Sequence, residues 1–279
     1  MNRRLVPTLT LLGLTALGSW AWMGASPSGS GSFVAGHTVQ PEAVFHGSTV
    51  TIRGFRDFVY RSDTDFDERY VERAFDLDQV RSVWYVLTPF SEDWRGPAHS
   101  FLSFGFADST FLSISVEARR ELDEEYSMLG GLLHRYSLLY VIGSEEDLVG
   151  VRALHRDPAV LVYPIRATSE ASRTLLVEML ERANALRENP EFYNTLINNC
   201  TTNILDHVNR VAPGDPIPYG PRVLLPGYSD QLAYERGLID TDLSLEEARI
   251  RFRVNERARQ WADAPDFSVR IRADDTRGA

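Results

Sequence analysis

Alternation of hydrophobic and polar positions dominates the middle of the chain and predicts β-strands. The pattern begins with TVTIRGFRDFVYR, residues 49–61, and further β-rich runs follow, with Asp, Ser, Gly and Pro between them. These runs are residues 82–90, 99–106, 111–117, 138–143 and 160–167. Together they predict a mainly antiparallel sheet.

Helical periodicity appears between and after the later strands. The clearest helix has Thr168 or Ser169 as its N-cap and an apolar stripe on one face. The stripe consists of Leu176, Met179, Leu180, Ala183 and Leu186. A second helix is predicted to begin near Asn199 or Cys200, and a short one near residues 243–252. Strands and helices in this arrangement predict an α+β fold with helices packed on the sheet.

An uncharged segment, residues 5–25, follows Arg3 and Arg4 at the N-terminus. Its 21 residues would span about 31 Å as a helix, enough to cross the hydrocarbon core of a bilayer. The bulky Trp20 and Trp22 leave few small-residue cleavage sites, which favours a retained signal anchor over a cleaved signal peptide. Either segment directs export, so we expect the rest of the chain to lie on the far side of the membrane, either anchored to it or released from it.

Composition divides the remaining chain into three parts. Residues 26–49 are rich in Ser and Gly and predict a flexible linker. Residues 50–240 contain the predicted strands and main helices and form the expected domain. Residues 241–279 are expected to be a C-terminal helical extension and tail.

Charge and cysteine content restrict the function further. The chain has 29 Lys plus Arg against 39 Asp plus Glu, a formal net charge of -10, which argues against nucleic acid as a main partner. Cys200 is the single cysteine in 279 residues, so it cannot form an internal disulfide. An exported free thiol is a liability unless it is used, and the alternative is a buried, inert cysteine.

The polar residues around Cys200 suit a reactive thiol. At a helix start the sulfur would lie near unpaired backbone N–H groups and the positive end of the helix dipole, and both favour the thiolate. Asn199 and Thr201 are hydrogen-bonding residues that could donate to a developing oxyanion. The alternative is that they only cap the helix, and the local sequence does not distinguish the two roles.

A nucleophilic cysteine needs a base, and His99 is the best placed of the six histidines. It begins a strand in which residues 99, 101, 103 and 105 share one face, so a rigid sheet would aim its imidazole. A purely structural histidine at a strand end is the alternative. His207 is about 10 Å from Cys200 along the same helix, too far for a hydrogen bond, and is expected at the surface.

Metal and cofactor chemistry has little support in the sequence. The histidines and the single cysteine lack ligand spacings such as HxxxH or CxxC, so we predict no zinc site and no cofactor. Glu145, Glu146 and Asp147 are adjacent but lack the spacing of a calcium loop, and are expected in a solvated turn.

Five segments, in order, resemble the bacterial family named after the N-terminal periplasmic domain of the lipoprotein N-acyltransferase Lnb. These segments are TVTIRGFRDFVYRSDTDFDERYVERAFDL, AHSFLSFGF, SISVEARRELDEEYS, LLYVIGSEEDLVGVR and FYNTLINNCTTNI. The resemblance covers roughly residues 50–240. The order of histidine before an Asn-Cys pair at a helix start also resembles the permuted papain-like core of NlpC-type enzymes and lecithin:retinol acyltransferase.

The resemblance implies a protein anchored on the periplasmic side of the bacterial inner membrane or free in the periplasm. It also implies a Cys200 nucleophile and a His99 base, with acyl transfer or hydrolysis at the thiol. The third group is open: Glu117 is the first choice and Ser115 the alternative, since both lie on one face of the next strand. The alternative to a catalytic role is that Glu117 only forms an ion pair with Arg119 or Arg120. The implied enzyme takes an acyl chain from a phospholipid donor as a Cys200 thioester and passes it to an amine of a lipoprotein or peptide acceptor.

Two other functions remain open at this point. The same thiol and histidine would serve a cysteine peptidase or amidase that acts on cell-wall peptides, with water resolving the intermediate. A non-catalytic envelope binding module with an inert Cys200 is the third alternative.

Overall fold

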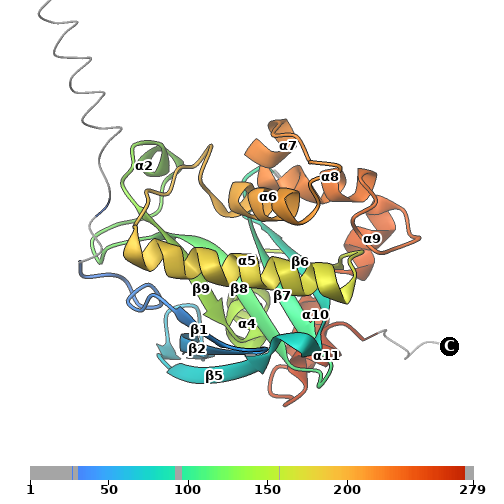
Figure 1. The fold of residues 1–279 in the computed structure, drawn as a ribbon, viewed down its shortest axis with the longest axis horizontal. Coiled ribbons are helices and arrows are strands. Elements are labelled where there is room, and N and C mark those ends of the chain that lie inside the picture. The colour runs from blue at the N-terminus through green and yellow to red at the C-terminus, as the bar shows by residue number, and fades with distance from the viewer. Residues whose placement is uncertain (1–26, 28–30, 92–95, 157, 274–279) are drawn as a thin grey trace, which may run out of the picture.

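The computed structural model describes residues 27, 31–91, 96–156 and 158–273, which form an α+β fold around a mixed sheet (Figure 1). The sheet is eight-stranded, in the order β1-β2-β9-β8-β7-β6-β10, with β5 paired to β2. Its strands are β1 (Glu42–His46), β2 (Thr49–Arg56), β5 (Tyr70–Asp76), β6 (Val80–Pro89), β7 (Ala98–Phe106), β8 (Phe111–Arg119), β9 (Ser137–Gly143) and β10 (Leu161–Pro164). Two short strands, β3 (Val59–Tyr60) and β4 (Phe66–Asp67), pair separately.

Helices lie between the last strands of the chain and after them. They are α2 (Met128–Leu132), α3 (Glu145–Leu148), α4 (Gly150–His155), α5 (Ser169–Glu188), α6 (Cys200–Val211), α7 (Pro221–Leu224), α8 (Ser229–Glu235), α9 (Leu245–Arg251), α10 (Asn255–Gln260) and α11 (Phe267–Arg270). The 3-10 turns are η1 (Leu77–Gln79) and η2 (Pro226–Tyr228). The predicted long helix is confirmed as α5, the helix at Cys200 as α6 and the short C-terminal helix as α9.

The sheet is mixed, and the prediction of a mainly antiparallel sheet is corrected in this respect. The β6–β7, β7–β8 and β8–β9 pairs are antiparallel, whereas β2 and β9 run parallel where Arg56 pairs with Gly143. A hairpin fixes antiparallel direction, but β2 and β9 are far apart in sequence, and no hairpin connects them. Their relative direction is therefore decided by packing and could not be predicted from the turn residues.

The sheet begins within residues 26–49, so the predicted linker is too long. Strand β1 pairs with β2 over its whole length, and the backbone of Ala43 exchanges hydrogen bonds with the Asn184 side chain of α5. Further upstream, Phe33 forms a β-bridge with Glu121. The Ser- and Gly-rich composition that suggested flexibility ends near residue 32, and the residues after it are held by the sheet.

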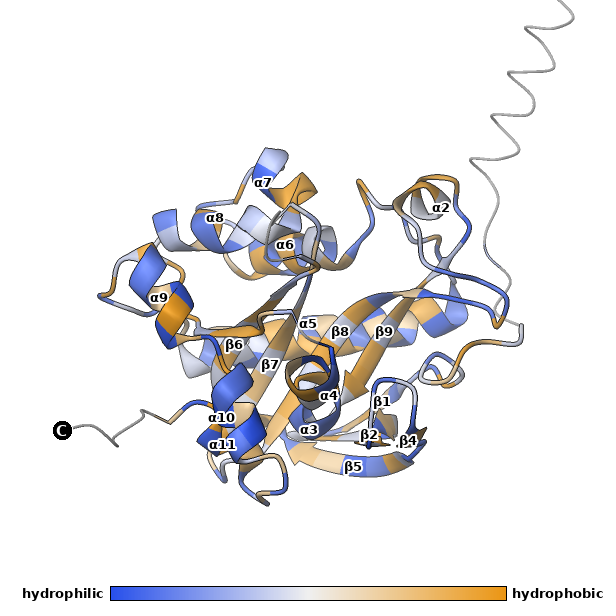
Figure 2. Ribbon diagram, turned by 180° about the vertical axis from the view of Figure 1, so that it is seen from behind, coloured by the Kyte–Doolittle hydropathy of each residue, from blue (hydrophilic) through white to orange (hydrophobic). Residues whose placement is uncertain are grey.

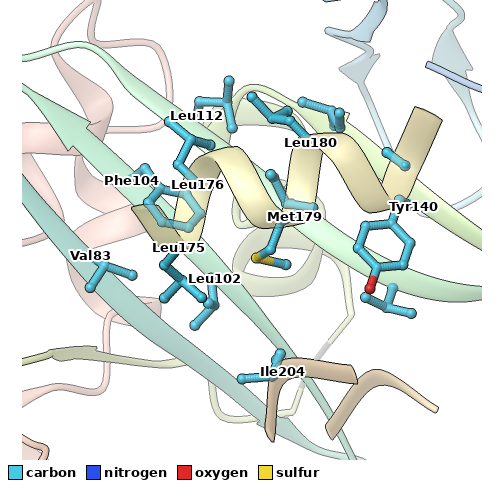
Figure 3. Close-up of a cluster of buried hydrophobic side chains, with 14 of the residues drawn as sticks. Val83, Leu102, Phe104, Leu112, Tyr140, Leu175, Leu176, Met179, Leu180 and Ile204 are labelled. Carbon is cyan, nitrogen blue, oxygen red and sulfur yellow. The ribbon is translucent and has the colours of Figure 1, made fainter. Parts of the chain in front are cut away.

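Helices α5 and α6 cover one face of the sheet (Figure 1). Thr168 caps α5 as predicted, with its hydroxyl accepting a hydrogen bond from the Ala171 N–H at 3.1 Å. The apolar stripe of α5 packs on β6, β7 and β8, and Ile204 of α6 joins the same cluster (Figure 3). This core fixes the position of α6, and therefore of Cys200, against the sheet.

The opposite face is covered by α3, α4, α10 and α11 (Figure 2). Phe101 of β7 lies in this second core together with Val254 and Phe267 from the C-terminal segment. The segment beyond residue 240, predicted as an extension and tail, therefore contributes helices that complete the core. Because both faces of the sheet are covered, every residue of β7 is buried.

Two of the three acidic residues of α3, Glu145 and Asp147, are buried, contrary to the predicted solvated turn, whereas Glu146 is exposed. Glu145 pairs with Arg272 at 2.7 Å, and Asp147 pairs with Arg56 at 2.7 Å. Both carboxylates have no exposed side-chain surface. Each arginine comes from a distant part of the chain, so nothing near residue 145 in the sequence indicates the pairing.

The predicted signal peptide or anchor, residues 1–25, lies outside the described residues. Within the described part of the chain, no helix combines the length and apolar character needed to cross a membrane.

Candidate active site

Cys200 is the first residue of α6, as the sequence predicted. The Asn199 side-chain oxygen accepts hydrogen bonds from the N–H groups of Thr201 at 2.9 Å and Thr202 at 3.0 Å. The Thr202 hydroxyl accepts in return from the Asn199 N–H at 2.8 Å, which completes a capping box. The Asn199 amide nitrogen donates to the Thr195 carbonyl at 2.6 Å. Asn199 therefore acts as a cap here, the alternative that the sequence left open.

His99 lies near the start of β7 and faces the third groups proposed from the sequence. Its Nε2 lies 2.7 Å from the Ser115 hydroxyl and 3.2 Å from Glu117 Oε1. The Ser115 hydroxyl also donates to Glu117 Oε1 at 2.7 Å. Phe101 of β7 pairs with Ser115 of β8. Because the strands are antiparallel, continuing this register places His99, two residues before Phe101, opposite Glu117, two residues after Ser115. Both candidates therefore contact one ring nitrogen.

Arg152 of α4 holds the Glu117 carboxylate, a contact the sequence analysis missed. Its guanidinium donates to Glu117 Oε1 at 3.0 Å and to the Leu148 carbonyl at 2.7 Å. Arg119, an expected partner of Glu117, instead donates to the His37 carbonyl at 2.9 Å. The only sequence signal for Arg152 is that it ends LLYVIGSEEDLVGVR, one of the segments that carry the family resemblance.

Cys200 and His99 form a hydrogen-bonded pair whose charges favour each other. Burial alone lowers the pKa of His99, but the Glu117 carboxylate and the Cys200 hydrogen bond outweigh it and raise the pKa to about 9. Burial alone raises the pKa of Cys200, but the hydrogen bond and charge of His99, the Ser100 N–H and the Thr201 hydroxyl lower it below its usual value. Both shifts therefore favour the thiolate–imidazolium form of the pair over the neutral form.

Cys200, His99 and Glu117 line one cavity of about 620 Å³. Its walls carry aromatic rings and cationic side chains, a combination suited to an amphipathic anion. The aromatic residues are Tyr60, Phe66, Phe90, Tyr126 and Tyr193, and the arginines are Arg56, Arg120, Arg152 and Arg156. Three of these arginines pair with carboxylates, Arg56 with Asp147, Arg152 with Glu117 and Arg156 with Asp63, and these pairs balance much of the positive charge.

A second, apolar cavity of about 110 Å³ adjoins the Cys200 end of α6. Thr201 lines it together with Ile204, Val208 and residues of α5 and α8. The Thr201 hydroxyl lies 3.0 Å from the Ser100 hydroxyl and 3.7 Å from the Cys200 sulfur. Of the two predicted oxyanion residues, Thr201 thus has its hydroxyl beside the sulfur, whereas the side chain of Asn199 is used by the cap.

His207 is buried, and its expected surface position is wrong. It lies three and seven residues after Ile204 and Cys200, on the face of α6 that packs on the sheet. Its Nε2 lies 2.9 Å from the Tyr140 hydroxyl. Burial, followed by the charges of Arg210 and Arg182, lowers the pKa of His207 to about 4.

The depressed pKa of His207 predicts that acid destabilises the fold. The unfolded chain binds a proton at this residue below about pH 6.5, whereas the native state binds it only near pH 4, so stability falls over this window. Between pH 7 and pH 5 this histidine contributes a loss of about 2 kcal/mol. We expect His207→Gln to reduce the loss of urea-unfolding free energy over that range, while exposed His46→Gln does not. An unchanged pH dependence in His207→Gln would contradict this assignment.

Among the residues that the structure describes, no group of three or more His, Cys, Asp or Glu side chains could hold a metal ion.

Fold and site together define an α+β domain with a buried Cys–His pair whose imidazole is held by a serine and a carboxylate. The chain belongs to the Lnb N-terminal periplasmic domain family, which it matches over residues 66–226. The matched range includes His99, Glu117 and Cys200, and the family confirms the predicted extracytoplasmic location. No curated protein and no solved structure matches the chain, so the permuted papain-like core stays a prediction.

Proposed function

We propose that this domain is a cysteine acyltransferase that uses Cys200 as nucleophile and His99 as acid and base. The observation that carries the proposal is the buried pair of Cys200 and His99, with His99 Nε2 within 3.2 Å of Glu117 and the sulfur at the start of α6. A buried thiol without a function would not need a hydrogen-bonded histidine whose Nε2 contacts a serine and a salt-bridged carboxylate.

The reaction begins with attack of the Cys200 thiolate on the carbonyl carbon of an ester. The C–S bond forms, the ester C–O bond breaks, and the leaving alcohol takes the proton of the His99 imidazolium. The thioester is then attacked by an amine, which gives a proton to His99 as the amide forms and the C–S bond breaks. The thiolate is thereby restored. The Cys200 N–H, at the first helical position, and the Thr201 hydroxyl are the proposed oxyanion donors.

A phospholipid donor and a lipoprotein or peptide amine acceptor fit the chemistry of the cavities. Arginines in the Cys200 cavity would attract the phosphate of a lipid head group. The apolar cavity beside Thr201 offers room for part of an acyl chain. The proposed anchor at residues 5–25 would keep the enzyme at the membrane that supplies this donor.

The position of the cysteine on a helix, beside a histidine on a strand, supports the proposed permuted papain-like core.

Mass spectrometry of intact protein tests the proposal. We expect incubation with phosphatidylethanolamine to add one fatty-acyl mass to Cys200, removable by neutral hydroxylamine, which cleaves thioesters. Adding a lipopeptide with a free amine should discharge the adduct onto the peptide. The matched control is Cys200→Ser, in which no hydroxylamine-labile adduct should appear.

The other outcomes distinguish the alternative functions. A peptide mass on Cys200 after incubation with cell-wall peptides would overturn the acyltransferase and support the peptidase or amidase. No adduct with either substrate would support the non-catalytic binding module. The alternatives use the same geometry, because each needs at most a nucleophile, a base and oxyanion donors.

A further inference from the structure

Exposed apolar side chains gather around α2, a region not used by the proposed chemistry. The α2 surface, as we name it, consists of Leu122, Met128, Leu129, Leu133, Leu196 and Ile197. Leu129 is 63% exposed and Ile197 70% exposed. The Thr195 hydroxyl donates to the Met128 carbonyl at 2.8 Å, which joins the loop before α6 to α2. Single exposed apolar residues are ordinary, but a contiguous group marks an interaction site.

The α2 surface lies at the entrance of the Cys200 cavity. Tyr126, two residues before α2, lines this cavity and is 39% exposed. Tyr193, in the loop that carries Leu196 and Ile197, lines the same cavity. Figure 2 shows α2 and the loop before α6 close together, with hydrophobic colouring at their tips. Whatever covers this surface therefore lies next to residues that line the cavity of the candidate nucleophile.

Ser32 and Phe33 are fixed at the same place. The Leu122 N–H donates to the Ser32 carbonyl at 2.9 Å, and Phe33 bridges to Glu121. In the sequence, residues 26–31 separate the uncharged segment 5–25 from Ser32. Six residues reach at most about 22 Å when extended. A segment inserted in a membrane would therefore hold the α2 surface close to that membrane.

We propose that the α2 surface inserts into the interface of a lipid bilayer and thereby places the entrance of the Cys200 cavity against the membrane. The apolar side chains enter the interface, and Tyr126 and Tyr219 lie at its polar boundary, where tyrosine is favoured. The exposed Glu121, Asp123 and Glu125 are part of the same region. Since these charges oppose anionic lipid, the expected bilayer is zwitterionic and the attraction is apolar.

Fluorescence in reconstituted full-length protein tests the docking without any turnover. One new cysteine is introduced into the Cys200→Ser protein and labelled with NBD, an environment-sensitive dye. The three labelled variants are Leu129→Cys, Ile197→Cys and Ile250→Cys. The vesicles contain phosphatidylcholine and phosphatidylethanolamine, with or without nitroxide on the acyl chains. Ile250 is the matched control because it is 79% exposed and lies in α9, at the other end of the molecule from α2 (Figure 1).

We expect a blue shift and at least threefold stronger nitroxide quenching at positions 129 and 197 than at position 250. Equal quenching at the three positions would overturn the proposal. A shift at 129 and 197 that depends on protein concentration in detergent, without nitroxide quenching in vesicles, would assign the surface to a second copy and also overturn it. Because Cys200 is absent from the labelled proteins, the result stands apart from that of the adduct experiment.

Discussion

Replacing Cys200 with serine is expected to lower phospholipid-to-amine acyl transfer by about 10³-fold or more, and His99→Ala by roughly 10²- to 10⁴-fold. The serine hydroxyl stays protonated at neutral pH, so the variant loses the thiolate nucleophile, while the side-chain volume at position 200 is nearly kept. Alanine at position 99 removes the imidazole that hydrogen-bonds the sulfur and carries the proton in both steps. The measurement is the rate of lipopeptide acylation in detergent micelles at pH 7.

Folding has to be separated from chemistry in these two variants. Circular dichroism and urea unfolding should change little for Cys200→Ser, because the capping box at Asn199 and Thr202 is untouched. The double variant should be no slower than the slower single variant, since residues of one catalytic unit are not additive. Near-normal turnover in a folded single variant would rule out the Cys200–His99 pair as the catalytic centre.

Glu117→Gln is expected to slow alkylation of Cys200 by iodoacetamide at pH 6 by about tenfold or more, and Ser115→Ala by no more than about threefold. Against the effect of burial, Glu117 and the Cys200 hydrogen bond raise the pKa of His99 to about 9, so the wild-type imidazolium is favoured at neutral pH and lowers the pKa of Cys200. Without this carboxylate, burial lowers the pKa of His99, the imidazole becomes neutral, and the pKa of Cys200 rises. Less thiolate then remains at pH 6.

The pH profile distinguishes this positioning role from simple damage to the fold. Wild-type protein should react at pH 6 faster than a free thiol of pKa about 8.5. In Glu117→Gln the rise in rate should move to higher pH, whereas in Ser115→Ala it should stay in place because Glu117 Oε1 lies 3.2 Å from His99 Nε2. A profile that moves equally in both variants would contradict this prediction and show that Ser115 and Glu117 are both needed to set the pKa of His99. A rate scaled down equally at every pH would instead indicate restricted access to the sulfur.

The sequence by itself determined the local features of this protein. The alternation of β7 and β8 placed His99, Ser115 and Glu117 on strand faces that could meet, and the structure brings them together. The Asn-Cys-Thr-Thr run defined the start of α6, because a capping box uses hydrogen bonds between residues three positions apart. Such short-range interactions are contained in the sequence pattern itself.

The tertiary structure decided every feature that depends on residues far apart in the chain. Glu145 and Asp147 look like part of a solvated turn until Arg272 and Arg56 are placed against them. His207 is on a polar stretch of sequence but on the helix face that packs on the sheet, and Arg152 reaches Glu117 from another element. The parallel pairing of β2 with β9 has the same origin. Local periodicity fixes which face a side chain occupies, whereas its partner is fixed only when packing brings distant elements together.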